Sequence, residues 1–319
     1  MAKLQSSEVV GVANRPATIC VNTVCLWFDT TNLKPMASYC SRSGAGTWSS
    51  GGALITARWQ LGGTGTQNEG LVLGGLSNAN VTCTEEYNGT SWSAGGSLIT
   101  ARISLASAGL QNEGLAIGGI TTVSVSCTEE YNGTSWSVGG SLITGRGYMD
   151  GSGTQNEALV AGGYSTVGVS CTEEYNGTSW SIGGALSLAR YHLGLAGTQN
   201  EGLAIGGWNP ARSCTEEYNG TSWSAGGVLI TARAAYVGMG SQNAALSAGG
   251  YVSGGRVTCT EEYNGTSWSA GVALIVGRSN GAGGGSQGAS FLAGGSTGTI
   301  VACTEEYLKS SYTIVDCIL

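Results

Sequence analysis

The stretch CTEEYNGTSWSAGGSLITAR, residues 83–102, returns along the chain with little change. Its opening C-T-E-E-Y occurs six times, and the intervals between the cysteines are 44, 44, 43, 45 and 44 residues. A double glycine precedes every copy, and a tryptophan follows the first five. A repeat of this length predicts similar units stacked into one structure rather than a series of separate domains. The six cysteines are Cys83, Cys127, Cys171, Cys214, Cys259 and Cys303.

One unit, from the second copy, contains four segments with the composition of short β-strands. They cover residues 104–110, 114–119, 123–131 and 135–140. Asn132-Gly133 between the last two predicts a tight hairpin turn of type I′. A four-stranded antiparallel unit cannot bury both of its faces alone. Radial stacking of such sheets gives a β-propeller, which is the all-β fold we expect.

The order of the marker residues indicates a particular kind of propeller. A double glycine, a tyrosine such as Tyr87 and a tryptophan five residues later, Trp92, resemble the kelch repeat, as does one arginine near the start of each unit. The resemblance covers about residues 46–307 and implies a six-bladed kelch-like β-propeller. Trp48 matches the fourth strand of a unit whose earlier strands are missing, so we expect the N-terminal strand around Trp48 to complete the last blade. A seventh blade built from the N-terminal segment is the rival interpretation.

Charged residues also recur once per unit. A Glu-Glu pair lies in each third strand, and Arg58, Arg102, Arg146, Arg190, Arg233 and Arg278 precede the first strands. A stacked blade covers both faces of the third strand, so one glutamate per unit needs a partner, and we expect a ring of Glu–Arg pairs. The repeat cysteines should lie too far apart for disulfides and act as small buried residues. A bridge among Cys20, Cys25, Cys40 and Cys317 stays open.

Residues 1–45 do not follow the repeat. Leu26-Trp27-Phe28-Asp29-Thr30-Thr31-Asn32, with Gly46-Thr47-Trp48 later, resembles a strand–turn–strand module of tailed-phage fibre and other virion proteins. The resemblance implies a hairpin that attaches the protein to other virion proteins, and an ordinary hairpin closing the main domain is the alternative. We therefore divide the chain into an attachment segment at 1–45, a propeller at 46–307 and a C-terminal tail at 308–319.

Composition excludes several classes of function. The net charge is −7 and the 13 basic residues form no stripe, so we expect no nucleic-acid binding. No apolar run reaches about 18 residues, which predicts no membrane insertion. The first residues lack the apolar stretch of a secretory signal, so we expect assembly in a host cytoplasm. His192 is the only histidine. We therefore expect no catalytic residue, no metal and no cofactor.

The copies differ mainly at two places, after the repeat arginine and after the double glycine. Both connections should lie at the same end of a propeller, around the mouth of its channel. Aromatic side chains beside amides are typical of surfaces that stack on sugar rings or bind proteins. Aromatics that plug the channel, or a face that drifts without selection, are the alternatives. The candidate ligand-binding residues are Trp59, Tyr148, Asp150, Tyr164, Tyr191, His192, Trp208, Asn209, Tyr236 and Tyr251.

Taken together, the sequence favours a non-enzymatic virion protein, a fibre, spike or capsid decoration, whose propeller face binds a host surface glycan or protein. A free intracellular kelch interaction module or lectin is the second hypothesis. A glycan-processing enzyme is the third, and it would need more acids on the variable face than Asp150.

Overall fold

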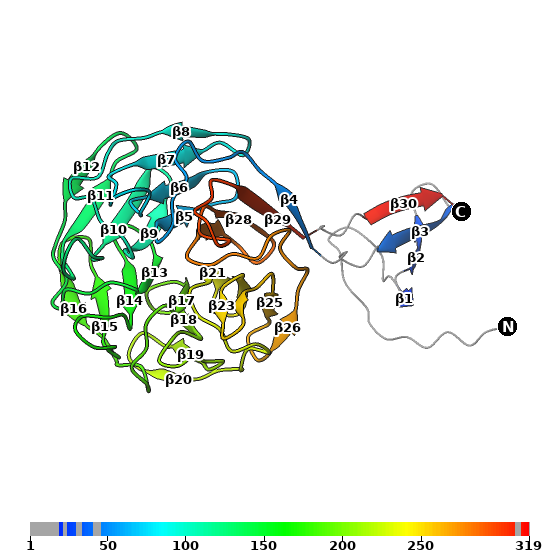
Figure 1. Ribbon diagram of the computed structural model, residues 1–319. Helices are drawn as coiled ribbons and strands as arrows, with labels where there is room; N and C mark the ends of the chain where they lie inside the picture. The colour runs from blue at the N-terminus through cyan, green and yellow to red at the C-terminus, as the bar shows by residue number, and fades with distance from the viewer. Residues whose placement is uncertain (1–18, 22–23, 30–33, 41–45, 310–313, 319) are drawn as a thin grey trace. The chain divides into compact units, whose positions relative to one another are not determined.

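The computed structural model describes residues 19–21, 24–29, 34–40, 46–309 and 314–318, with side chains described for 46–309. Within these ranges the secondary structure consists of strands, turns and bends, and no helix occurs. Contacts divide the chain into two units, one of residues 47–308 and one of residues 1–46 with 309–319. The larger unit is a ring of six four-stranded antiparallel sheets (Figure 1).

Each blade runs outward from an innermost to an outermost strand, and in blades 1 to 5 the strands follow the order of the sequence. Blade 1 contains β5 (Gly62–Gly65), β6 (Gly70–Leu73), β7 (Thr84–Tyr87) and β8 (Trp92–Ala94). Blade 2 contains β9 (Ala106–Leu110), β10 (Glu113–Ile117), β11 (Thr128–Tyr131) and β12 (Trp136–Val138). Blade 3 contains β13 (Asp150–Gly153), β14 (Ala158–Ala161), β15 (Thr172–Tyr175) and β16 (Trp180–Ile182).

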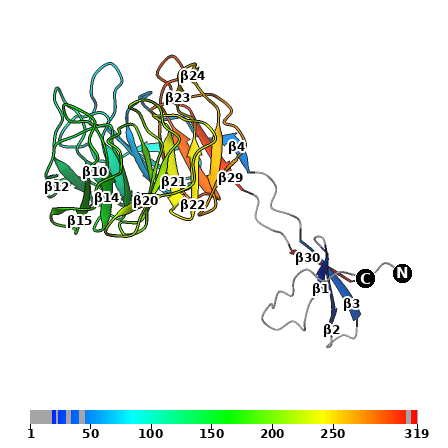
Figure 2. The same cartoon turned by 90° about the horizontal axis from the view of Figure 1, so that it is seen from below.

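Blades 4 to 6 repeat this arrangement. Blade 4 contains β17 (Gly194–Gly197), β18 (Gly202–Ile205), β19 (Thr215–Tyr218) and β20 (Trp223–Ala225). Blade 5 contains β21 (Val237–Ser241), β22 (Ala244–Ala248), β25 (Thr260–Tyr263) and β26 (Trp268–Ala270). Between β22 and β25, a small hairpin of β23 (Tyr251–Val252) and β24 (Gly255–Arg256) rises from one face of the ring (Figure 2).

The sixth blade closes the ring. It contains β27 (Ala282–Gly285), β28 (Ala289–Ala293), β29 (Thr304–Leu308) and, as its outermost strand, β4 (Thr47–Ser50). β4 pairs antiparallel with β29, and Trp48 lies opposite Tyr307. This is the register that Tyr131 and Trp136 have in blade 2. The six-bladed fold and its closure by the strand around Trp48 are confirmed, and residues 47–308 form no seventh blade.

The smaller unit holds a sheet of β1 (Ile19–Val21), β2 (Val24–Asp29), β3 (Lys34–Cys40) and β30 (Ile314–Ile318). β2 and β3 pair as the hairpin expected from the Trp-Phe-Asp segment, with Asp29 opposite Lys34. The turn between them and the side chains of Cys20, Cys25, Cys40 and Cys317 lie outside the described residues. The segment expected to be a C-terminal tail contributes β30, which pairs antiparallel with β3.

A buried Arg–Glu pair lies in every blade, as the repeat predicts. Arg102 and Glu129 are almost fully buried, and their side chains meet at 3.1 Å. The Glu129 carboxylate also accepts the backbone N–H groups of Ile99 and Thr100, which hold the loop entering the blade. Desolvation lowers the pKa of Arg102, although the adjacent carboxylate opposes that effect. The pairs are Arg58–Glu85, Arg102–Glu129, Arg146–Glu173, Arg190–Glu216, Arg233–Glu261 and Arg278–Glu305.

Neighbouring blades are joined by a constant set of polar contacts between otherwise apolar surfaces. Trp136 of blade 2 donates its indole N–H to Thr84 Oγ1 of blade 1 at 3.0 Å. Tyr131 donates its hydroxyl to Glu86 Oε1 at 2.6 Å, and desolvation raises the pKa of this tyrosine to about 12. Gln111 donates to the carbonyl of Tyr87 at 2.6 Å. Buried polar groups are therefore satisfied across the seam between blades, which fixes each blade against its neighbour.

Two details of the repeat differ from expectation. The Asn-Gly turns are not of type I′, because Gly133 has a positive φ of 85° whereas Asn132 does not. Instead, Asn132 Oδ1 accepts the N–H groups of Thr134 and Ser135, which widens the loop to four residues. The repeat cysteines are free, as expected, but they are half-buried rather than buried.

Candidate functional site: the channel mouth

Six residues, one from each blade, form a closed circle of backbone hydrogen bonds at one end of the central channel. Each of them lies two positions after a buried repeat arginine. Ser104 donates its N–H to the carbonyl of Gln60, Tyr148 donates to Ser104, and the series continues until Gln60 donates to Asn280. The N···O distances are 2.7–3.0 Å. We call these residues the mouth ring: Gln60, Ser104, Tyr148, His192, Ala235 and Asn280.

All six residues of the mouth ring adopt a left-handed backbone conformation, with φ between 52° and 56°. None of them is glycine, so in each residue the Cβ atom crowds the backbone, and this makes the conformation unfavourable. A conformation of this kind persists where the surrounding structure over-determines it, and the closed circle of hydrogen bonds does so here. The main chain of the mouth is therefore constant, although its six side chains are all different.

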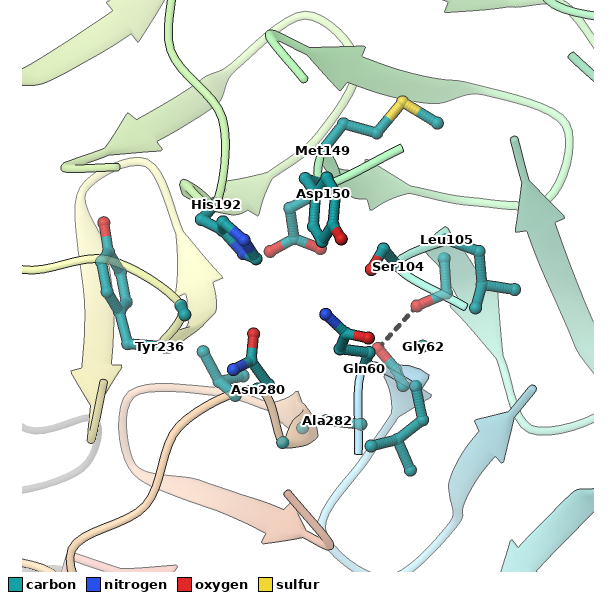
Figure 3. Close-up of a pocket in the computed structure, with 18 of the residues that line it drawn as sticks. Gln60, Gly62, Ser104, Leu105, Met149, Asp150, His192, Tyr236, Asn280 and Ala282 are labelled. Carbon is teal, nitrogen blue, oxygen red and sulfur yellow. Dashed lines mark hydrogen bonds between the residues drawn. The ribbon is translucent and has the colours of Figure 1, made fainter. Parts of the chain in front are cut away.

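The side chains inside the mouth ring enclose a pocket of about 100 Å³. In Figure 3, Gln60, Asp150, His192 and Asn280 point toward its open centre. Asp150 begins β13 and is held at both carboxylate oxygens, because Oδ1 accepts the N–H of Gly151 and Oδ2 that of Leu195, each at 2.9 Å. Leu195 belongs to blade 4, so the carboxylate lies at the seam between blades 3 and 4.

Burial shifts the pKa values of the two titratable groups of the pocket in opposite directions. Desolvation raises the pKa of Asp150 to about 7, although its two backbone hydrogen bonds oppose the shift. Desolvation lowers the pKa of His192 to about 4, so the imidazole is neutral at pH 7. The pocket thus holds a carboxyl group that titrates near neutrality beside an uncharged imidazole.

Three of the predicted aromatic residues gather beside the pocket. Tyr148 lies 4.3 Å from His192 and 6.2 Å from Tyr191, measured between ring centroids. Tyr164 packs edge-on against Tyr191 at 5.3 Å and against Tyr148 at 6.4 Å. All four side chains are half-buried. The structure therefore brings residues from blades 3 and 4 together as one aromatic cluster, defined here as Tyr148, Tyr164, Tyr191 and His192.

The backbone of Trp208 pairs with that of Tyr191, next to the cluster, and Asn209 follows it at an exposed position. Tyr251 is exposed on β23, on the variable face, and it is not a member of the aromatic cluster. Trp59 is half-buried and pairs through its backbone with Leu76 in blade 1.

Tyr236 differs from the expectation of an exposed aromatic. It is 6 % exposed, and its hydroxyl donates to the carbonyl of Ile205. Burial raises its pKa, and its ring lies 5.4 Å from the Arg233 guanidinium carbon. The ring of Tyr236 therefore forms part of the pocket wall and of the seam between blades 4 and 5.

Sequence reasoning left three pocket residues out of the site, Gln60, Ser104 and Asn280. The signal was present, because each follows a repeat arginine by two positions in a stretch where the copies differ. It also missed an apolar feature common to most blades. Isoleucines three positions after the double glycine that follows the repeat tryptophan, such as Ile55 and Ile99, are 62 % and 56 % exposed.

Within the described residues, no group of three or more histidine, cysteine, aspartate or glutamate side chains could hold a metal ion. Among these residues there is also no helix long and apolar enough to cross a membrane.

Comparison with known proteins supports the fold and gives no information on function. No protein-family model matches the sequence, and no curated protein sequence matches it. Among solved structures, one titled "Structure of YjhT" superposes with a TM-score of 0.69 at 14 % sequence identity. The match covers 83 % of this chain and 99 % of the other. The chain is a six-bladed β-propeller.

Proposed function

We propose that this protein is a non-enzymatic binding module whose variable propeller face binds a host surface glycan or protein. One observation carries the proposal. Copies that agree at every seam differ at the mouth, and there the differences assemble Tyr148, Tyr164, Tyr191 and His192 into one half-buried cluster. Rigid aromatic side chains with polar tips suit stacking on sugar rings and serve as anchors in protein interfaces.

The absence of a reaction is also part of the proposal. Asp150 is a single carboxylate among the residues that line the pocket, whereas glycoside hydrolysis uses two. His192 makes ring contacts with Tyr148 and Tyr191, and a relay would need a nucleophile and an orienting acid beside it. These groups favour recognition over catalysis.

The setting that we propose is the virion of a tailed phage. Its support is the resemblance of the segment from Leu26 to Asn32, and of Gly46-Thr47-Trp48, to a module of virion proteins. The hairpin of β2 and β3 belongs to the smaller of the two units. In this proposal residues 1–45 contact other virion proteins, and the kelch-like propeller presents its variable face to the host.

Substitution of the aromatic side chains tests the binding face. We expect Tyr191→Ala with Trp208→Ala to weaken binding to glycan arrays and to host cells at least tenfold, or about 1.4 kcal/mol. Thermal unfolding should change little, because both side chains are half-buried and take no part in the recurring Trp–Thr, Tyr–Glu and Gln–carbonyl contacts between blades. Leu110→Ala is the matched control, because Leu110 is 54 % exposed at the end of β9 distant from the mouth. A large loss of stability with unchanged binding contradicts the proposal.

The virion setting needs a separate measurement. We expect the native protein to co-sediment with intact particles at fixed stoichiometry, followed by mass spectrometry across a density gradient. Recovery in the soluble fraction alone would favour a free kelch interaction module or lectin.

A further inference from the structure

The pocket inside the mouth ring presents a carboxylate without a counter-ion. Among the residues that line it, Asp150 is the only acid, and none is lysine or arginine. Each oxygen of Asp150 accepts one backbone N–H, so lone pairs remain on both. Asp150 is half-buried, and a charge that is partly removed from water is costly unless it is paired, so this pocket favours a ligand that brings a positive charge.

The repeat supplies internal controls for the role of Asp150. The equivalent positions of the other five blades carry glycine, alanine or valine, and those blades have the same strands and the same Arg–Glu pairs. A carboxylate at this place is therefore not required by the fold. The five residues are Gly62, Ala106, Gly194, Val237 and Ala282.

Neutral acceptors surround the carboxylate. Ser104 is only 8 % exposed, its hydroxyl has no hydrogen-bond partner, and Figure 3 shows it directed into the pocket. The amide groups of Gln60 and Asn280 face the same centre (Figure 3). An ammonium group has three donors and no acceptor, so one carboxylate with two or three neutral acceptors satisfies it fully. An unpaired hydroxyl that is nine-tenths buried is the kind of group that a bound ligand completes.

Other cations fit the pocket less well. Calcium takes six to eight oxygen ligands with several carboxylates, and the described residues offer no cluster of three acidic, cysteine or histidine side chains. The rings of Tyr148 and His192, with centroids 4.3 Å apart, add aromatic surface beside the carboxylate, and the face of a tyrosine ring attracts an organic cation. A volume of about 100 Å³ is enough for several water molecules, and so for a small head group.

We propose that the pocket binds a primary ammonium group, which pairs with Asp150 and donates to Ser104, Gln60 and Asn280. The ammonium group could belong to an amino sugar or to a free alkylamine, and both present the same chemistry. The amino-sugar form rests on the proposed glycan-binding face and would make it selective for glycans with free amines.

Calorimetric titration of the full chain at pH 7 tests the pocket, because Asp150 is then partly ionised and the amines of both probes carry charge. The probes are butylammonium with neutral butanol as its control, and a β-linked glucosamine trimer with its N-acetylated form as its control. We expect the charged member of at least one pair to bind at least tenfold more tightly than the neutral member. Binding by both amines assigns the site to amino sugars, whereas binding by butylammonium alone assigns it to free amines.

Two variants link binding to the carboxylate. Asp150→Asn should weaken amine binding at least tenfold, and so should Asp150→Gly, which introduces the residue of blades 1 and 4. Glu157→Gln is the matched control, because it removes one exposed charge from the same blade and should leave binding unchanged. Equal binding of charged and neutral probes, or unchanged binding by both Asp150 variants, overturns the inference. Glycan binding that depends on Tyr191 and Trp208 would survive that result, so the two proposals fail separately.

A pH series gives a second readout. Butylammonium should bind more weakly at pH 5.5 than at pH 8, because Asp150 becomes protonated while the alkylamine stays charged. His192 stays neutral across this range. An affinity independent of pH also overturns the inference. The other titratable groups on the elements around Asp150 are Tyr148, Tyr236 and the pairs Arg146–Glu173 and Arg190–Glu216.

Discussion

The seams between blades and the mouth of the channel are built on the same six-fold frame, but they use it in opposite ways. At the seams, side chains recur unchanged, so Trp136 donates to Thr84 as Trp180 donates to Thr128, both at 3.0 Å. At the mouth ring, the backbone recurs unchanged while the side chains differ from blade to blade. Constant side chains thus mark where the fold is stabilised, and constant backbone with variable side chains marks where a ligand can be recognised.

The largest difference in stability between the two regions should be seen when an arginine is replaced by alanine. We expect Arg102→Ala to lower the free energy of unfolding by about 3–5 kcal/mol, because it leaves the Glu129 carboxylate buried without its partner. Arg256→Ala on the variable face should cost less than about 1 kcal/mol, because that side chain is exposed and donates only to Ser296 Oγ. Guanidinium unfolding measures both. If Arg102→Ala and Arg256→Ala cost the same, the distinction between seams and mouth fails. If Arg190→Ala costs as much as Arg102→Ala, the distinction is strengthened, because the same pair then stabilises another blade equally.

A smaller effect is expected from Asp150, with a defined pH dependence. Its pKa is raised from 3.8 to about 7 by burial, so between these values the folded state binds a proton that the unfolded state has released. The free energy of unfolding therefore falls as the pH rises through this range. The shift corresponds to about 4 kcal/mol, but an Asn amide leaves one of the two backbone N–H groups without an acceptor. Asp150→Asn should therefore remove that fall and stabilise the protein at pH 8 by a net amount on the order of 1–2 kcal/mol.

The advantage of Asp150→Asn should vanish near pH 2.5, more than one unit below the unfolded pKa of 3.8, where both states carry a neutral side chain. Thermal unfolding of wild type and variant across the pH series measures this, with the exposed Glu113→Gln as control. His192 has the opposite dependence, because its lowered pKa costs stability as the pH falls from 6.5 toward 4. That contribution is common to both proteins and cancels in their difference. A variant that is less stable than wild type at pH 8 would show that the carboxylate supports the fold.

The smallest effect concerns the backbone of the mouth ring. Ala235 has a φ of 55°, where glycine is favoured, so Ala235→Gly should change the free energy of unfolding by less than about 0.5 kcal/mol, toward greater stability. Ala106→Gly, at a fully buried position in β9 with ordinary φ, should cost about 1 kcal/mol or more. Urea unfolding of the two variants compares them directly. Similar losses at both sites would mean that the mouth ring carries no backbone strain.

The sequence by itself determined the fold, because every blade repeats the same pattern of strand, turn and marker residues. Six copies in register indicated the sheets, Trp48 indicated the strand that closes the ring, and one buried glutamate per copy implied the arginine that pairs with it. These inferences succeed because equivalent residues are buried, and equivalent charges are paired, in the same way in each repeat. The turn at Asn132 was assigned wrongly, because the dipeptide Asn-Gly is also compatible with a loop in which the asparagine side chain accepts backbone N–H groups.

Only the tertiary structure decided the site. Sequence variation indicated which end of the propeller differs among copies, but it could not distinguish Tyr236, buried in the wall, from Tyr191, half-buried in the aromatic cluster. Nor could it show that Gln60, Ser104 and Asn280 face Asp150 across the channel, because they are brought together by closure of the ring. The repeated sequence determines the features that all blades share, because these depend on a local pattern of residues. The pocket instead depends on six different side chains that meet at the axis of the ring.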